Sequence, residues 1–318
     1  MDIKDPAIVY LMKSRDPSIR YFTLTDLLEK KSTSTTVRRT KAAIPTGPRV
    51  KALLTGHKAV FNCHPYKKWI GAHWRLVSLV ELNLPPGHTA VRPALEQTLD
   101  WLTGKAHRDS IKSINGRIRR CGSQEGNALM TSVYFGLFQD HRVRYLADSL
   151  VEWQWPDGGW NCDQDPKAHH ASFYETITPL RGLYYYYQAT GDKTYLDAAD
   201  KAAEFFLRHK MFRSEKNGKV INGNWLKLHY PLYWHYDILH GLKILNLLGK
   251  LKEKRCQEAL DIIEKKRRRD GTWHAEAYYW NPKASTSAHR DVADWGRAGP
   301  NEWITLGAMQ VLKASGRW

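Results

Sequence analysis

The 318-residue sequence predicts an all-α fold in which buried helices alternate with surface helices. Two observations support this expectation: segments of two contrasting compositions succeed one another along the chain, and a short turn motif recurs after two of them. Hydrophobic residues make up 42% of the chain, which is normal for a globular protein with a sizeable core.

The two compositions define two sets of predicted helices. One set is aromatic-rich and apolar on nearly all sides, which is typical of a buried helix: Trp69–Leu82, Glu125–Phe138, Ser172–Tyr187, Leu232–Leu248 and Glu302–Leu312. The other set is charged and amphipathic, as a surface helix is: Val91–Leu102, Arg142–Trp153, Tyr195–His209 and Lys252–Lys265. Strict alternation of inner and outer helices is what an α/α toroid requires, and an open solenoid is the alternative.

A turn motif follows one of the outer helices. In Gln154–Trp160 the proline at 156 forbids continuation of the helix, and Asp157-Gly158-Gly159 supplies the positive-φ positions of a tight turn. A weaker copy is Arg267–Trp273, and a degenerate third copy is Gly223–Trp225. A turn repeated after successive helices indicates a repeated supersecondary unit, and we expect it to brace hairpins rather than to carry chemistry.

This Gln-x-x-x-Gly-x-Trp turn resembles the glutamine-tryptophan repeat of squalene and hopene cyclases and of the wider terpenoid-cyclase and protein-prenyltransferase superfamily. The resemblance implies an α/α toroid over residues 61–318 and a hydrophobic, isoprenoid-like substrate attacked by acid-initiated chemistry. The catalytic motifs of that superfamily are missing. Asp163-Gln164-Asp165 is followed by Pro166 rather than by a third acid, and the zinc-binding Asp-x-Cys pair is absent.

The N-terminal residues 1–60 form a separate predicted region. Asp5-Pro6 and Asp16-Pro17 place an N-cap residue before a proline, which is a helix-start signal. The second of these strings is similar to the start of a HEAT-type repeat helix, and a further helix is expected from Ser34 to Ala43. This region is predicted to be a helical arm, or else the first hairpins that close the ring.

The predicted catalytic residues are acids and a histidine near the starts of inner helices. Glu175 and Asp237 open two of these helices, and the first turns of inner helices gather at one mouth of a toroid. Asp163 and Asp165 lie in the loop before one of them, and His235 lies in the loop before the other. Acids beside aromatic surface acquire raised pKa values, so we expect a proton donor among these five residues.

The predicted substrate-binding residues are mainly aromatic side chains of the same rim: Trp69, Trp74, His170, Tyr174, Trp234, Trp273 and Glu302. No cofactor is expected. No metal is expected either, because the four cysteines are scattered and no paired Cys/His spacing follows Cys162.

The chain carries a net charge of +17, with basic runs at Arg117–Arg120 and Lys265–Arg269. These runs are either solvated helix faces or an attraction to an anionic membrane surface; no base-reading motif indicates a specific nucleic acid. The first residues do not resemble a signal peptide, and no apolar run is long enough to span a bilayer. We therefore expect a cytoplasmic protein, with possible peripheral membrane contact; its oligomeric state is left open.

Three functions stay open from the sequence. The first is a cyclase-like or prenyltransferase-like protein that acts on or binds a hydrophobic substrate. The second is a carbohydrate-active enzyme with paired carboxylates, since α/α toroids also host glycosidases and lyases. The third is a non-catalytic helical scaffold. A closed apolar cavity favours the first, a wide polar cleft the second, and the absence of a deep cavity the third.

Overall fold

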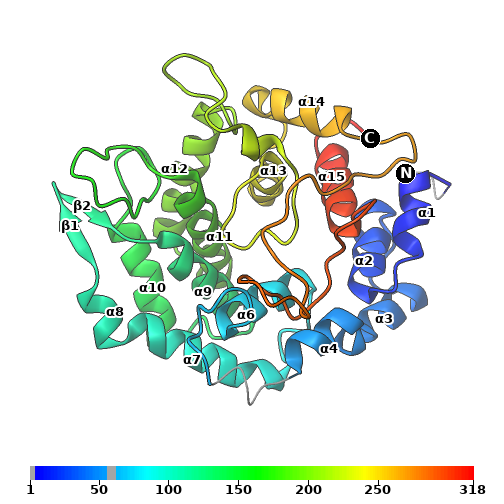
Figure 1. Ribbon diagram of the computed structural model, residues 1–318, viewed down its shortest axis with the longest axis horizontal. Helices are drawn as coiled ribbons and strands as arrows, with labels where there is room; N and C mark the ends of the chain where they lie inside the picture. The colour runs from blue at the N-terminus through cyan, green and yellow to red at the C-terminus, as the bar shows by residue number, and fades with distance from the viewer. Residues whose placement is uncertain (1–3, 56–61) are drawn as a thin grey trace.

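The computed structural model describes residues 4–55 and 62–318, and it confirms the predicted all-α class (Figure 1). Five inner helices overlap the predicted buried segments: α6 (Ala72–Glu81), α9 (Gly122–Tyr134), α11 (Phe173–Thr190), α13 (Ile238–Leu247) and α15 (Glu302–Ala314). Four outer helices follow the amphipathic segments: α7 (Arg92–Thr103), α10 (His141–Glu152), α12 (Lys193–Arg208) and α14 (Gln257–Lys265). Figure 1 shows these outer helices at the periphery, with the inner helices nearer the middle.

The inner helices contact one another in chain order. Packing runs from α6 to α9, then to α11, α13 and α15, and each outer helix lies against its inner neighbours. A close approach joins α9 and α11, where a Cβ on Gly126 would lie 2.3 Å from the backbone nitrogen of Pro179. Glycine at this position lets the two backbones touch.

The N-terminal region packs into this arrangement instead of projecting from it. Its helical elements contact α15 on one side and α6 on the other, so the succession of contacts returns to its start. They are α1 (Pro6–Met12), α2 (Pro17–Phe22), η1 (Thr23–Leu27), α3 (Thr35–Ala42), η2 (Ile44–Thr46) and α4 (Pro48–Leu54). The predicted division at residue 60 lies outside the described residues.

Two of the recurrent turns have the same geometry. The indole N–H of Trp160 donates to the carbonyl of Leu150 at 2.9 Å, and that of Trp273 donates to the carbonyl of Ile263 at 2.7 Å. Both tryptophans are fully buried. The structure thus supports a bracing role. Trp225 differs, because its indole N–H donates to the hydroxyl of Tyr174, so the third copy is not the same turn.

The first residue of each turn links it to the next outer element. Gln154 donates to the carbonyl four residues ahead and to Ala198 of α12, both at 2.8 Å. Arg267 also donates to the carbonyl four residues ahead, and it forms an ion pair of 3.0 Å with Asp5 at the start of α1. Helix α1 therefore holds the second turn through its first residue, in the way that α12 holds the first turn.

The structure also contains a β-hairpin that was not predicted from the sequence. Strands β1 (Lys112–Ile114) and β2 (Arg117–Arg119) pair antiparallel around Asn115-Gly116, whose two residues both have positive φ. An Asn-Gly pair between short strands is a strong hairpin signal. The remaining short helical turns are η3 (Thr89–Val91), α8 (Lys105–Asp109), η4 (Gly223–Leu226) and η5 (Lys254–Cys256).

The predicted helix Leu232–Leu248 begins six residues late, at Ile238. Asp237 is its N-cap, and the carboxylate accepts the backbone N–H of His240 at 2.7 Å. This bond satisfies one of the free N–H groups of the first turn, so the helix starts here. The residues before it form a loop that fills the middle of the molecule. Within the described residues, no helix combines the length and apolarity needed to cross a membrane.

Candidate functional site

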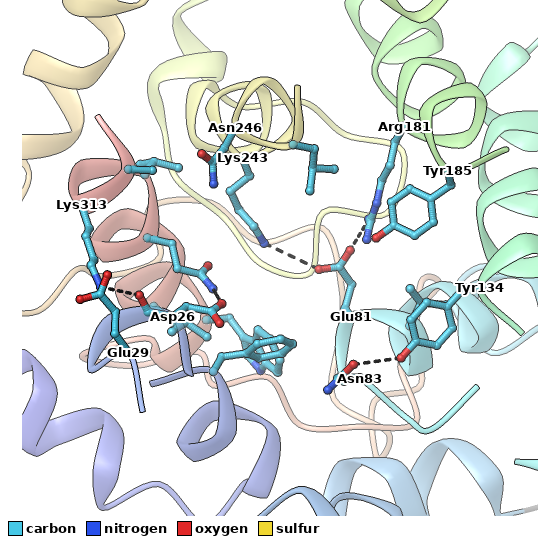
Figure 2. A pocket seen from close by; sticks show the side chains of 18 residues that line it. Asp26, Glu29, Glu81, Asn83, Tyr134, Arg181, Tyr185, Lys243, Asn246 and Lys313 are labelled. Carbon is cyan, nitrogen blue, oxygen red and sulfur yellow. Dashed lines mark hydrogen bonds and ion pairs between the residues drawn. The ribbon is translucent and has the colours of Figure 1, made fainter. Parts of the chain in front are cut away.

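A pocket of about 540 Å³ lies among the inner helices, beside the C-terminal parts of α6, α9, α11 and α13 and along α15, and we call it the central pocket (Figure 2). All five inner helices and η1 contribute to its wall. The polar lining residues include Asp26, Glu81, Tyr134, Arg181, Lys243 and Gln310. The lining also includes the apolar side chains of Phe22, Val80, Leu247, Trp303, Leu306 and Val311.

An ion cluster of Glu81, Arg181 and Lys243 occupies the centre of this pocket, as Figure 2 shows. Glu81 is the last residue of α6. A carboxylate there is repelled by the negative end of the helix dipole, so nearby cations are needed to stabilise it. Arg181 of α11 binds one of its oxygens, and the ammonium nitrogen of Lys243 from α13 lies 3.7 Å from the other. Burial would raise the pKa of Glu81, but the two cations hold it at about 2. One carboxylate thus faces two cations.

A smaller deep pocket of about 20 Å³ continues from the central pocket, with Glu81 and Arg181 in the lining of both. Three buried polar atoms of this lining have no hydrogen-bond partner: Nε of Arg181, Nδ2 of Asn127 and the hydroxyl of Tyr233. All three can donate a hydrogen bond. Since buried donors are rarely left unpaired in folded proteins, this group marks a place for a ligand acceptor atom or a water molecule.

Aromatic side chains close the other end of the deep pocket. Tyr233 stacks on Trp69 with ring centroids 4.1 Å apart, and Trp69 contacts Trp74 edge-on. Beside them His235 stacks on Tyr279 at 3.6 Å. The mouth predicted at the helix starts is therefore filled, and the central pocket lies toward the C-terminal ends of α6, α9, α11 and α13.

Two predicted catalytic residues near α13 have structural surroundings that do not suit proton donation. Asp237 is fully buried, and its carboxylate accepts the backbone N–H groups of His229 and His240. Burial would raise its pKa, but His229 and these bonds lower it, so it is a poor proton donor. Burial lowers the pKa of His235 to about 3, with smaller contributions from neighbouring cationic groups.

The predicted acids of the preceding loop are exposed. Asp163 accepts the backbone N–H of Asp165, and Asp165 accepts that of Lys167, at 2.9 and 2.8 Å. The loop is joined to β1 through Lys112 and Gln164, away from the central pocket. Glu175 lies at the start of α11, where burial raises its pKa, but it does not line the central or the deep pocket.

The predicted substrate-binding residues do not share one cavity. Trp69, Trp74 and Trp273 are core residues. His170 and Tyr174 line a separate open pocket of about 820 Å³ beside α12, and Trp234 contacts Tyr174 edge-on. Glu302 pairs with Arg49 at 3.1 Å in another pocket, of about 580 Å³, next to α1.

The ion cluster was not predicted from the sequence, although charged residues within apolar segments indicate it. Glu81, Arg181 and Lys243 are charged residues in segments otherwise apolar on nearly all sides. A charge inside a buried helix needs a partner, and the partners of an inner helix are its inner neighbours.

A scan of the chain against protein-family models found no match, and a search of curated proteins found no significant relative. The family implied by the glutamine-tryptophan turn therefore stays a prediction.

Proposed function

We propose that the chain binds a hydrophobic small molecule of the isoprenoid type, with an anionic or hydrogen-bond-accepting head, in the central pocket. The observation that carries this proposal is the ion cluster with two cations for one carboxylate, above three unpartnered donors. Such a site favours a ligand that brings acceptor atoms or negative charge. The isoprenoid class comes from the resemblance of the Gln154–Trp160 turn.

The apolar part of the pocket lining supports a hydrophobic ligand body. Phe22, Trp303 and Leu306 line it together with Val80 and Val311. The pocket volume of about 540 Å³ lies in the range of small-molecule sites, which are mostly apolar with a few convergent polar groups. The head group of the ligand would contact the ion cluster, and its hydrocarbon body would contact these apolar side chains.

Binding is better supported than acid-initiated catalysis. Protonation of an olefin needs a protonated acid beside the substrate, and the pKa of Glu81 is held at about 2. Asp237 and His235, which were predicted to supply this chemistry, have lowered pKa values and do not line the central pocket. We therefore assign the pocket a binding role.

The test compares substitutions of two lysines whose side chains are exposed to a similar extent. Lys243→Met removes a cation of the ion cluster, and Lys250→Met removes one that pairs with Asp200 outside the pocket. Their side chains are 25% and 28% exposed. Binding of farnesol and of farnesyl diphosphate is measured by native mass spectrometry and calorimetry.

We expect Lys243→Met to weaken farnesyl diphosphate binding about tenfold, since a hydrogen bond to a charged group contributes roughly 1.5–3 kcal/mol. The effect on farnesol should be smaller, and Lys250→Met should change neither. Equal weakening by both lysine variants would contradict the proposal. So would a protein that binds neither probe and retains an oligosaccharide on purification.

A further inference from the structure

Three chemistry-bearing side chains meet at the end of the molecule opposite the central pocket. Cys121 precedes α9, Cys162 lies two residues after Trp160, and Glu175 stands in the first turn of α11. One ligand atom from each, two sulfurs and a carboxylate oxygen, lies within 4.8 Å of the other two. We call this group the Cys-Cys-Glu cluster. All three residues are partly buried.

The backbone holds the three residues rigidly. The backbone N–H of Ser123 donates to one oxygen of Glu175 at 3.0 Å, which turns the other oxygen toward the sulfur of Cys162, 3.6 Å away. The N–H of Arg120 donates to the carbonyl of Asn161, next to Cys162. The cluster is therefore assembled by contacts among α9, α11 and the buried turn, before any ligand enters.

The chemistry of the cluster suits a cation. Each of the three residues offers one ligand atom, and all three groups become anionic on ionisation. The adjacent cation Arg120 is already paired with Glu125 at 2.7 Å. A bound divalent cation would hold the two thiolates and the carboxylate together, because it stabilises these anions directly.

We propose that Cys121, Cys162 and Glu175 bind one zinc ion through two thiolate sulfurs and a carboxylate oxygen. Two sulfurs with one oxygen form a donor set suited to zinc, whereas magnesium and calcium prefer oxygen ligands alone. The protein supplies three ligands, which leaves a fourth tetrahedral position for water or a ligand, as in catalytic zinc sites. Binding releases the thiol protons and that of the carboxyl group where it is protonated.

This inference departs from the expectation of no metal, which was based on spacing along the chain. The ligands belong to three separate segments, so no short Cys-x-x-Cys pattern announces them. It also differs from an Asp-x-Cys arrangement, and it does not depend on the function proposed for the central pocket.

The experiment measures metal content and ligand-field spectra of the full chain, purified reduced and without chelator. We expect about one zinc per chain by elemental analysis, as a single site requires. Cobalt added to the metal-free protein should give a thiolate-to-metal charge-transfer band and the visible bands of tetrahedral cobalt. Zinc should displace both and release protons in weak buffer.

The variants are Cys121→Ser, Cys162→Ser and Glu175→Gln, with Cys63→Ser, outside the cluster, as the matched control. Each serine variant should lose the charge-transfer band or halve it. Glu175→Gln should weaken zinc binding at least about tenfold, a loss already typical of residues that only orient ligands. Cys63→Ser should retain metal and spectrum.

Circular dichroism checks that each variant is folded, and Cys162→Ser and Glu175→Gln suffice if Cys121→Ser unfolds. The proposal is overturned if the reduced protein shows no cobalt spectrum and no zinc, or if the spectrum survives in both cysteine variants. A Cys121–Cys162 disulfide whose reduction restores no metal binding would overturn it as well.

Discussion

Single tryptophans carry much of the stability of the hairpins. Trp160 is fully buried, and its N–H groups bond to Leu150 and to Thr176. We expect Trp160→Ala to lower the free energy of unfolding by about 3–5 kcal/mol, as for other large core aromatics. Urea denaturation measures the change. Trp318→Ala, at the partly exposed chain end, is the control and should cost clearly less; equal costs would argue against the bracing role.

The first position of the turn can be occupied by glutamine or by arginine. Because Gln154 and Arg267 make the same bond four residues ahead, Arg267→Gln should keep the second turn intact. Its cost should stay within about 1 kcal/mol, the usual value of the exposed ion pair lost with Asp5. Arg267→Ala, which removes both bonds, should cost more in the same denaturation assay. A reversed order would show that the two turns are not equivalent.

At the level of elements, the contact between α9 and α11 tolerates no side chain. A Cβ at Gly126 would lie 2.3 Å from the backbone of Pro179, whereas a Cβ at Gly87 would meet nothing within 4 Å. Gly126→Ala should therefore destabilise the protein by roughly 1–3 kcal/mol or more, as overpacking does. Gly87→Ala is the control and should be close to neutral. Thermal melts of the two variants decide the matter, and similar melting temperatures would contradict the packing described.

The N-terminal helices behave as part of the ring of contacts. Ile8, Leu11, Ile19 and Leu27 are fully buried, and each contributes roughly 1.5–3 kcal/mol by burial. Deleting residues 1–33 therefore removes an amount comparable to the whole stability of a typical domain. We expect the truncated chain to lose cooperative unfolding and to bind a hydrophobic dye. A truncated protein with an unchanged melting temperature would show that this region is a dispensable arm.

At the level of the whole molecule, buried histidines make the fold sensitive to mild acid. Burial lowers the pKa of His73 and His235 to about 3 and that of His240 to about 4. An unfolded histidine binds a proton below about pH 6.5, while these folded ones stay neutral. The unfolded state then holds more protons, so stability falls as pH drops from about 6.5 toward 4. Each histidine contributes a slope of up to about 1.4 kcal/mol per pH unit.

Replacement of one histidine tests this pH dependence. His73→Leu should flatten the dependence of unfolding free energy on pH between about 6.5 and 4 by about one proton. His141→Leu is the control, since this side chain is 91% exposed, and it should leave the slope unchanged. An unaltered slope in His73→Leu would contradict the assignment. Glu81 acts in a lower window, because its carboxylate stabilises the fold above about pH 4.5 and loses this effect toward pH 2.

The surface charge is less concentrated than the sequence indicates. Arg119 is buried against Trp155, and Arg120 pairs with Glu125, so two of the three cations in the run at 117–120 are not free surface charges. Lys265, Arg268 and Arg269 stay exposed. Binding to an anionic membrane surface stays a prediction. Vesicles with anionic lipid should sediment the protein, less so at high salt, because exposed charges are screened within about 8 Å at physiological ionic strength.

A charge-reversal variant separates this attraction from unspecific adsorption. Lys265→Glu combined with Arg268→Glu and Arg269→Glu should reduce sedimentation with anionic vesicles and leave neutral vesicles unaffected. Equal binding of the unaltered protein to both vesicle types would remove the hypothesis.

The sequence by itself determined which long segments are helical, which of them are buried and which two turns are equivalent. These properties depend on neighbours along the chain: caps such as Asp16, the proline at 156, and apolar composition. Only the tertiary structure decided where the central pocket lies. The loop before α13 fills the predicted mouth, because its aromatic rings stack on Trp69 and Tyr279, segments far away in the chain.

The candidate site and the Cys-Cys-Glu cluster were decided in the same way. Glu81 meets Arg181 across 100 positions of sequence, and Cys121 meets Cys162 through the packing of α9 and α11 against the turn. Local sequence patterns indicate how a residue affects the helix to which it belongs. They do not record which helices come together in the fold, because that is settled by packing the whole core at once.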